Sequence, residues 1–140
     1  MSEDFDLVDF DPSNADHADW VHGSFRATLK DMFPWGMCAA MKLADSLRLE
    51  IDQPGTVTKV ITTKRDPDGL IGWVCTRPYQ NVVVFCYVKF ACRRYGVASS
   101  AILETGVDLT KRTGVVYWTR ACERILIEHS GYDLYFKVTE

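Results

Sequence analysis

The segment that most constrains the fold runs from Val82 to Leu103, VVVFCYVKFACRRYGVASSAIL. It opens with a nearly continuous apolar run, Val82–Val88, which is typical of a strand covered on both faces. Two arginines and a glycine follow, and after Gly96 the pattern becomes helical. Because the short strand VVYWT at Val115–Thr119 comes next, the sequence predicts a right-handed βαβ crossover.

The remaining apolar patterns predict two helices before this unit and one after it. The acidic and apolar alternation of Phe5–Asp11 is typical of a half-buried strand, and RDPDG at Arg65–Gly69 is a turn between two strands of a meander. The helix after Gly96 is expected to carry an apolar arc as far as Leu109 and to end with KRTG, whose Gly114 is the C-cap. The segment DPSNAD supplies the start of the first helix, whose apolar stripe is Val21, Phe25, Leu29 and Met32. The second helix carries Ala40, Ala44, Leu47 and Ile51 on one face and stops at QPG, and the last helix covers Arg120–Gly131. The other predicted strands cover Thr56–Thr63, Leu70–Thr76 and Asp133–Val138.

These elements follow one another in the order β-α-α-β-β-β-α-β-α-β. The order predicts an α/β (α+β) fold with a mixed, largely antiparallel central sheet and helices on both faces. The sequence contains no repeat, no low-complexity segment and no long linker, so residues 1–140 are expected to form a single domain.

The composition indicates the cellular compartment of the protein and whether it binds a metal ion. No apolar run approaches the about 18 residues of a membrane span, and the N-terminus lacks the pattern of a signal peptide, so we expect a cytoplasmic protein without membrane contact. The five cysteines form no CxxC pair, and neither they nor the three histidines show ligand spacing. We therefore expect buried thiols and no metal site.

Charge is distributed unevenly along the chain. Residues 1–19 contain seven acidic residues and no Lys or Arg, whereas the remaining residues hold 12 acidic residues against 16 basic ones. The body of the protein can therefore attract an anionic ligand although the whole chain has a net charge of −3. A solvated acidic terminus is the alternative interpretation of the first 19 residues.

The junction between the apolar strand and the next helix has the chemistry of an anion site. A helix N-terminus presents unpaired N–H groups and about half a positive charge. Gly96 lets a ligand approach the backbone, Arg93 and Arg94 supply cations, and small residues at Ala98 and Ser99 leave room for phosphates. The alternative is a turn glycine beside two surface arginines.

Arg93-Arg94-Tyr95-Gly96-Val97-Ala98 resembles the Arg/Gln-x-x-Gly-x-Gly/Ala signature of the GCN5-related N-acetyltransferase (GNAT) superfamily. The preceding CYVKFACR, Cys86–Arg93, is similar to the LYVxPxxR strand end of that family, with Phe90 where proline often stands. The predicted element order also matches that fold. The segment DWVHGSFRATLKDMFPW further resembles the opening of small GNAT-like proteins encoded by phages and prophages.

The resemblance implies an acetyl-CoA site. The backbone N–H groups of Arg94–Ala98 would cradle the pyrophosphate, and the main chain around Tyr87–Lys89 would hydrogen-bond the pantetheine and the thioester carbonyl. In the family this strand diverges from the next one to admit the cofactor. The residues assigned in this way to the cofactor are Tyr87, Val88, Lys89, Arg93, Arg94, Tyr95, Gly96, Val97, Ala98 and Ser99.

The usual catalytic tyrosine of the family is missing. Many members carry Asn-x-x-Ala-x-x-Leu-Tyr-x-x-x-Gly-Phe in the last helix, where the tyrosine protonates the departing thiolate. Alignment on Gly131 places Leu126 at the leucine and Ile127 at the tyrosine. Tyr117 on the neighbouring strand is the candidate substitute, and a packed strand tyrosine is the alternative. Candidates for the general base are Glu128 and His129 at the end of the last helix, and His22 and Arg26 on the first helix. For each of them a surface role is the alternative.

Three functions agree with these features. The first is an acetyl-CoA-dependent N-acetyltransferase acting on a primary amine, a small molecule or a peptide, by direct attack on the thioester. The second is a catalytically inactive GNAT-fold binding or assembly module, which Ile127 favours. The third is a phage enzyme acting on an amino-modified nucleobase, although the sequence lacks the Lys/Arg-rich stripe with aromatics of a strong nucleic-acid binder. A homodimer is compatible with the resemblance. Trp20, Phe33 and Trp35 are candidates for an acceptor pocket or a subunit contact, with core packing as the alternative.

Overall fold

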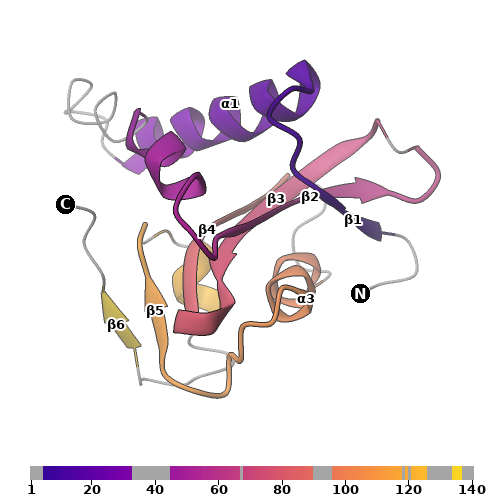
Figure 1. Cartoon of the computed structure of the whole chain (residues 1–140). Helices are drawn as coiled ribbons and strands as arrows, with labels where there is room; N and C mark the ends of the chain where they lie inside the picture. The colour runs from indigo at the N-terminus through magenta and orange to yellow at the C-terminus, as the bar shows by residue number, and fades with distance from the viewer. Residues whose placement is uncertain are drawn as a thin grey trace.

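The computed structural model describes residues 5–32, 45–66, 68–89, 96–117, 119, 121–125 and 134–136. This part of the chain contains two long helices, α1 (Ala15–Met32) and α3 (Val97–Glu104), a 3-10 turn η1 (Pro78–Gln80), and helical residues at 45–51 and 121–125 (Figure 1). The strands are β1 (Phe5–Asp9), β2 (Val57–Thr63), β3 (Leu70–Arg77), β4 (Val82–Val88), β5 (Thr113–Val115) and β6 (Leu134–Phe136). The element order confirms the predicted one.

The described strands form a mixed six-stranded sheet in the order β1-β2-β3-β4-β5-β6. The pairs from β1 to β4 are antiparallel, as expected for a meander, and β4 pairs with β5 in parallel. The parallel pair confirms the predicted crossover through α3. None of the described helices is both long and apolar enough to cross a membrane.

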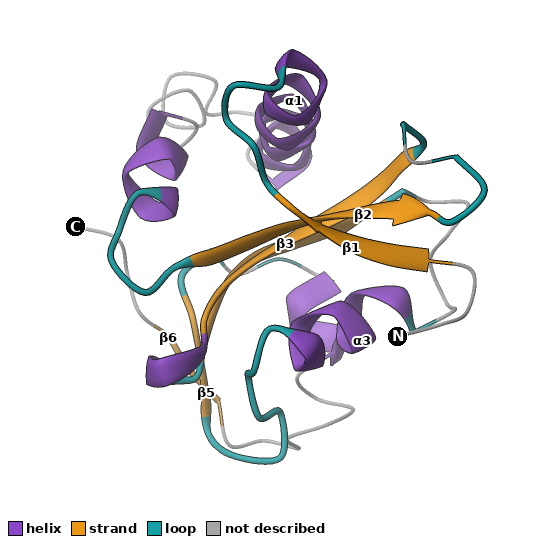
Figure 2. Ribbon diagram, turned by 45° about the vertical axis from the view of Figure 1, so that its right-hand side comes forward, coloured by secondary structure: helices purple, strands orange, loops and turns teal. Residues whose placement is uncertain are grey.

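Helices cover both faces of this sheet, as predicted. Figure 2 shows α1 and the helical residues 45–51 on one face, with α3 and the helical residues 121–125 on the other. Each face has its own buried cluster: Val21, Phe25 and Leu47 pack on the first, and Ala101, Ile102 and Cys122 pack on the second. Because β4 contributes to both clusters, its near-continuous apolar run follows from burial on two sides.

Helix α1 begins and packs as its sequence predicts. The side-chain oxygen of Asn14 accepts hydrogen bonds from the amides of Asp16 (3.0 Å) and His17 (3.3 Å), which caps the first turn. Val21, Phe25 and Leu29 recur every four residues and are all buried against the sheet. The helix is thus fixed along the face on which β3 and β4 present their aromatic side chains.

The predicted boundaries after Gly96 are wrong at two places. Helix α3 ends at Glu104 rather than near Leu109, because Gly106 adopts φ +105°, which terminates the helix well before Gly114. Strand β5 covers Thr113–Val115 rather than Val115–Thr119, so Gly114 is a strand residue and not a helix C-cap. Leu109 is nevertheless buried, in the loop between the two elements.

Strand β4 contains a bulge that its sequence does not reveal. Cys75 of β3 pairs with Phe85, but the next residue, Thr76, pairs with Val83, so Val84 is an extra residue on β4. Beyond the bulge the side chains change faces: Val84 and Phe85 both belong to the α1 side, and Cys86 then faces α3. The bulge therefore sets which β4 side chains face each layer near the end of the strand.

Candidate functional site

Strands β4 and β5 stay together over only the first half of β4. They pair at Val82 and Val83, and two further bonds follow, from the Val116 amide to the Val83 carbonyl (3.1 Å) and from the Tyr117 amide to the Val84 carbonyl (3.2 Å). In the described residues no further β4–β5 bond occurs, although β4 continues to Val88. Among the described residues the bonding between the two strands thus ends at the bulge, and the strands diverge there.

The last residues of β4 are held from the side of β3 and α1. The Lys89 amide donates to the Ile71 carbonyl at 2.8 Å, so this amide is committed to β3. The ring of Tyr87 packs edge-on against Trp20 at 5.6 Å, and the Lys89 ammonium lies 5.3 Å from the Trp20 ring centre. The Trp20 indole in turn donates to the Gly72 carbonyl at 3.1 Å. Trp20 is half-buried by these contacts and also lines a surface hollow beside the β4 end, whereas Phe33 and Trp35 lie outside the described residues.

The start of α3 has the backbone shape that an anion site requires. Gly96 adopts φ 68° and ψ 17°, a left-handed conformation that favours glycine, and a Cβ added there would meet no atom of the described residues within 4 Å. No described side chain caps the helix, and the Ser100 amide donates to the Gly96 carbonyl at 3.0 Å. Val97 is buried and anchors the turn, whereas Ala98 and Ser99 are half-buried. Arg93, Arg94 and Tyr95 lie outside the described residues.

Tyr117 stands at the point where β4 and β5 diverge. Its hydroxyl lies 2.5 Å from the hydroxyl of Ser46, and its side chain is 6% exposed. The ring packs edge-on against Phe25 at 4.9 Å and against Phe85 at 6.5 Å. The structure therefore places Tyr117 on the α1 side of the sheet with its hydroxyl fixed by the second helical segment. Glu128 and His129, the other predicted catalytic residues, lie outside the described part of the chain.

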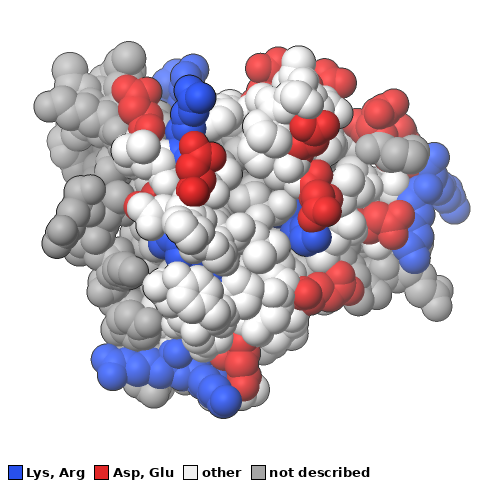
Figure 3. Space-filling view, in the orientation of Figure 1, with Lys and Arg blue, Asp and Glu red and all other residues white. Residues whose placement is uncertain are grey.

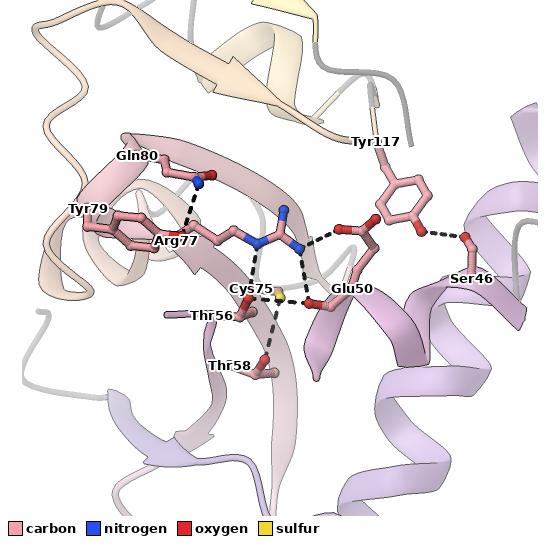
Figure 4. A network of polar contacts seen from close by, with 9 residues as sticks. All are labelled: Ser46, Glu50, Thr56, Thr58, Cys75, Arg77, Tyr79, Gln80 and Tyr117. Atoms are coloured by element: carbon pink, nitrogen blue, oxygen red, sulfur yellow. Dashed lines mark hydrogen bonds and ion pairs between the residues drawn. The ribbon is translucent and has the colours of Figure 1, made fainter. Parts of the chain in front are cut away.

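A buried ion pair fastens the helical segment that carries Ser46. Arg77 at the end of β3 forms an ion pair with the Glu50 carboxylate, and it donates to the Glu50 carbonyl (3.0 Å) and to the Thr56 hydroxyl (3.0 Å) (Figure 4). The two side chains are 5% and 10% exposed. Burial of both charges is tolerated because each is paired and hydrogen-bonded. No local pattern in the sequence indicated this pair, since its members are 27 residues apart.

His22 is a neutral base candidate among the described residues. Burial lowers the pKa of His22, and the nearby charges of Arg26 and Arg48 lower it further. Arg26 is exposed and lies one turn later on α1. At neutral pH the His22 ring can therefore accept a proton.

Several N-terminal acidic residues have structural partners. Asp9 forms an ion pair with Lys59, and the Asp11 carboxylate accepts from the Ser13 amide at 2.9 Å and from its hydroxyl at 2.6 Å. The bonds from Ser13 lower the pKa of Asp11. Acidic side chains are visible over the start of α1 (Figure 3). These acids thus help to form the β1–α1 connection.

One open hollow of about 560 Å³ lies between the start of α1, the β2–β3 turn and the end of β4. Its charged lining residues are Asp16, Asp19, Asp68 and Lys89. The described residues contain no group of three or more His, Cys, Asp and Glu side chains that could hold a metal ion.

Comparison with known proteins gives a match only at the level of structure. No protein-family model matches the sequence, and no curated protein matches it significantly. Among solved structures, the chain is similar to a protein described as an acetyl transferase from Pyrococcus furiosus, with a TM-score of 0.53 and 14% identity over 97% of this chain and 83% of that one.

Two other solved structures have lower TM-scores. AAC(6')-Iy in complex with the bisubstrate analogue CoA-S-monomethyl-acetylneamine has a TM-score of 0.42 and 11% identity, over 96% of this chain and 80% of that one. A ribosomal-protein-alanine N-acetyltransferase from Brucella melitensis biovar Abortus 2308 has a TM-score of 0.44 and 14% identity, over 99% and 82%. The likeness to the Pyrococcus furiosus protein, the predicted element order and the divergence of β4 from β5 agree: this chain has the fold of the GCN5-related N-acetyltransferases.

Proposed function

We propose that the protein is an acetyl-CoA-dependent N-acetyltransferase that transfers an acetyl group to a primary amine. The observation that carries this proposal is the divergence of β5 from β4 after the Val84–Tyr117 bond, with the left-handed Gly96 at the start of the next helix. A divergence of two parallel strands opens a main-chain edge, and a helix N-terminus attracts phosphate. A pantetheine chain and a pyrophosphate need these two features at neighbouring positions.

The residues at the start of α3 fit the pyrophosphate of acetyl-CoA. No described side chain fills the space beside Gly96, which supports the approach of a phosphate to the backbone, and the first-turn amides of Val97, Ala98 and Ser99 point out of the helix end. The resemblance adds the amides and side chains of Arg93, Arg94 and Tyr95 to this cradle. Acetyl-CoA supplies the activated acetyl thioester when it is bound.

The main chain of β4 is the proposed oxyanion donor. The described bonds from β4 to the β5 side end at Val84, where β4 has its bulge, and β4 continues to Val88. An amide aimed at the thioester oxygen stabilises the charge that develops there when the amine attacks. The resemblance places this donor in the main chain around Tyr87–Lys89, where the Lys89 amide already donates to the Ile71 carbonyl.

Tyr117 is the proposed proton donor to the leaving thiolate. Its position at the divergence places it beside the second half of β4, and Ser46 fixes its hydroxyl. The amine must also lose a proton, for which His22, Glu128 and His129 are the candidates. Of these, His22 is the described one, and its lowered pKa keeps it in the basic form at neutral pH.

The direct test is release of CoA thiol in the presence of acetyl-CoA and a panel of amines. The panel comprises polyamines, amino acids, aminoglycosides, peptides and amino-modified nucleosides. Release that depends on both the protein and one class of amine supports the proposal and identifies the acceptor class. Absence of binding to acetyl-CoA at high micromolar concentration would overturn it.

A second candidate is a GNAT-fold module that binds acetyl-CoA without turnover. The observation that favours it is the burial of Tyr117, whose hydroxyl is already engaged with Ser46 as in a structural tyrosine. Such a module binds acetyl-CoA in calorimetry but releases no thiol with any amine of the panel. Measuring binding and release on the same preparation therefore separates the two candidates.

A further inference from the structure

Two buried thiols meet across the interface between β4 and the last helical segment. The sulfur of Cys86 lies 3.5 Å from the sulfur of Cys122, and both residues are buried in the cluster on the α3 face of the sheet. Cys86 follows the β4 bulge, and Cys122 belongs to the helical residues 121–125. The two positions are 36 residues apart in the chain, so the tertiary fold alone brings the thiols together.

The location of the pair relates it to the strand divergence. Cys86 lies on β4 two residues after Val84, where the last bond to the β5 side is made, and Cys122 lies five residues after Tyr117. A covalent link between the two sulfurs would therefore join the second half of β4 to the chain that follows β5, beyond the point where the two strands diverge. The Cys122 amide also donates to the Thr119 hydroxyl at 3.1 Å, which fixes the start of the helical segment.

The thiols differ in acidity. The sulfurs of Cys86 and Cys122 share a hydrogen bond in which either can be the donor. With Cys86 as the donor, this bond raises the pKa of the Cys86 thiol and lowers the pKa of the Cys122 thiol. The thiolate is the nucleophile of thiol–disulfide exchange, so Cys122 is the member suited to attack first.

We propose that Cys86 and Cys122 are an oxidisable dithiol whose disulfide clamps the last helical segment onto β4. With a small organic disulfide as oxidant, the Cys122 thiolate attacks one oxidant sulfur and expels the first organic thiol, which leaves a mixed disulfide on Cys122. The Cys86 thiolate then attacks the Cys122 sulfur and expels the second organic thiol. The protein loses two protons and two electrons, and the oxidant becomes two thiols.

The clamp has a consequence that rests on the proposed function. To form a bond, the two sulfurs must approach from contact distance, which draws the helical segment toward β4. If acetyl-CoA binds between the second half of β4 and the helical residues 121–125, the oxidised protein binds acetyl-CoA more weakly than the reduced protein does. Reduction with dithiothreitol restores the affinity.

Cys75 provides a matched control. It is also buried, and burial raises the pKa of its thiol to about 12, but it lies in the cluster on the opposite face of the sheet, where its sulfur accepts from the Thr58 hydroxyl at 3.4 Å. The sheet separates Cys75 from the pair. Cys75→Ser is therefore expected to keep the crosslink, whereas Cys122→Ser and Cys86→Ser abolish it.

The experiment incubates the folded protein with 2-hydroxyethyl disulfide and maps disulfides by mass spectrometry of non-reduced peptides. The expected product is one peptide pair that joins Cys86 to Cys122, with a melting temperature that rises by several degrees and returns on reduction. A map in which Cys86 and Cys122 remain thiols, or pair with other cysteines, overturns the proposal. The map uses the unmodified chain, so it remains decisive if a serine variant does not fold.

Calorimetry with acetyl-CoA on the reduced and oxidised forms then tests the consequence. Weaker binding only after oxidation, and only in proteins that retain both cysteines, supports the clamp. Equal affinity of the two forms shows that the crosslink does not reach the cofactor site. Failure of the reduced protein to bind acetyl-CoA contradicts the proposed function instead, and the disulfide map still reports on the dithiol.

Discussion

The hydroxyl of Tyr117, just after β5, lies 2.5 Å from the hydroxyl of Ser46 on the second helical segment. This contact joins two segments 71 residues apart at the point where β4 and β5 diverge. A tyrosine held in this way has a defined position relative to the second half of β4. The contact therefore fixes the proposed proton donor, Tyr117, against the helical residues 45–51.

Replacement of Tyr117 by Phe tests the role of this hydroxyl. If it protonates the leaving thiolate, the rate of CoA thiol release falls by about 100-fold or more, since general acids contribute about 10²–10⁴. Ser46→Ala is expected to cause a smaller loss, because it removes the partner and not the donor. Acetyl-CoA affinity by calorimetry serves as the control and stays unchanged. An unchanged rate in Tyr117→Phe would assign the residue to packing.

The buried pair of Arg77 and Glu50 is expected to be essential for stability. Arg77→Met leaves the Glu50 carboxylate buried without its cation, which lowers the free energy of unfolding by about 3–5 kcal/mol. The surface pair of Asp9 and Lys59 is the matched control: their side chains are 85% and 29% exposed, so Asp9→Asn costs less than about 1 kcal/mol. Urea unfolding measures both. Equal losses in the two variants would contradict the buried pairing.

Gly72 is predicted to control the position of the β4 end. A Cβ at this residue would lie 2.4 Å from the Tyr87 carbonyl oxygen, so Gly72→Ala must push β4 away from β3. We expect a loss of about 1–3 kcal/mol in stability and weaker binding of acetyl-CoA. Gly23→Ala is the contrast: its Cβ meets nothing within 4 Å in the middle of α1, and the variant is expected to gain about 0.5–1 kcal/mol. Thermal unfolding and calorimetry report both effects.

The lowered pKa of His22 makes stability depend on pH. In the unfolded chain the imidazole binds a proton near its ordinary pKa of 6.5, whereas the folded protein resists protonation until a lower pH. The free energy of unfolding therefore decreases as the pH falls below 6.5 toward the folded pKa. His22→Gln should show a smaller decrease between pH 7.5 and pH 5.5 in denaturant titrations. An identical decrease in both proteins would argue against the burial of His22.

The sequence predicts the layers of this fold better than its boundaries. The run Val82–Val88 indicated a strand covered on both sides, and the clusters on the two faces confirm it. The end of α3 was misplaced because the apolar pattern continues through Val107 and Leu109, which stay buried although they are no longer helical. Gly106, in a conformation with positive φ, was the available signal.

Features that depend on pairing across the fold could not be predicted. The bulge at Val84 lies in an unbroken apolar run, so no change of alternation marks it. Glu50 and Arg77, Ser46 and Tyr117, and Cys86 and Cys122 are each separated by many residues, and no local pattern links their members. The predicted roles of Arg93, Arg94, Tyr95, Glu128 and His129 fall outside the described residues and remain predictions.

The most direct test of the central claim is calorimetric titration of acetyl-CoA into Gly96→Glu, with Gly96→Ala as the matched control. Alanine in the left-handed conformation lowers folding stability by about 1–2 kcal/mol, but its methyl group meets no atom of the described residues within 4 Å. Glutamate lowers folding stability by a similar amount and places a long negative side chain where the pyrophosphate is proposed to bind. We predict that Gly96→Ala still binds acetyl-CoA and that Gly96→Glu shows no binding while remaining folded. Wild-type affinity in folded Gly96→Glu would contradict the assignment of this helix start to the cofactor.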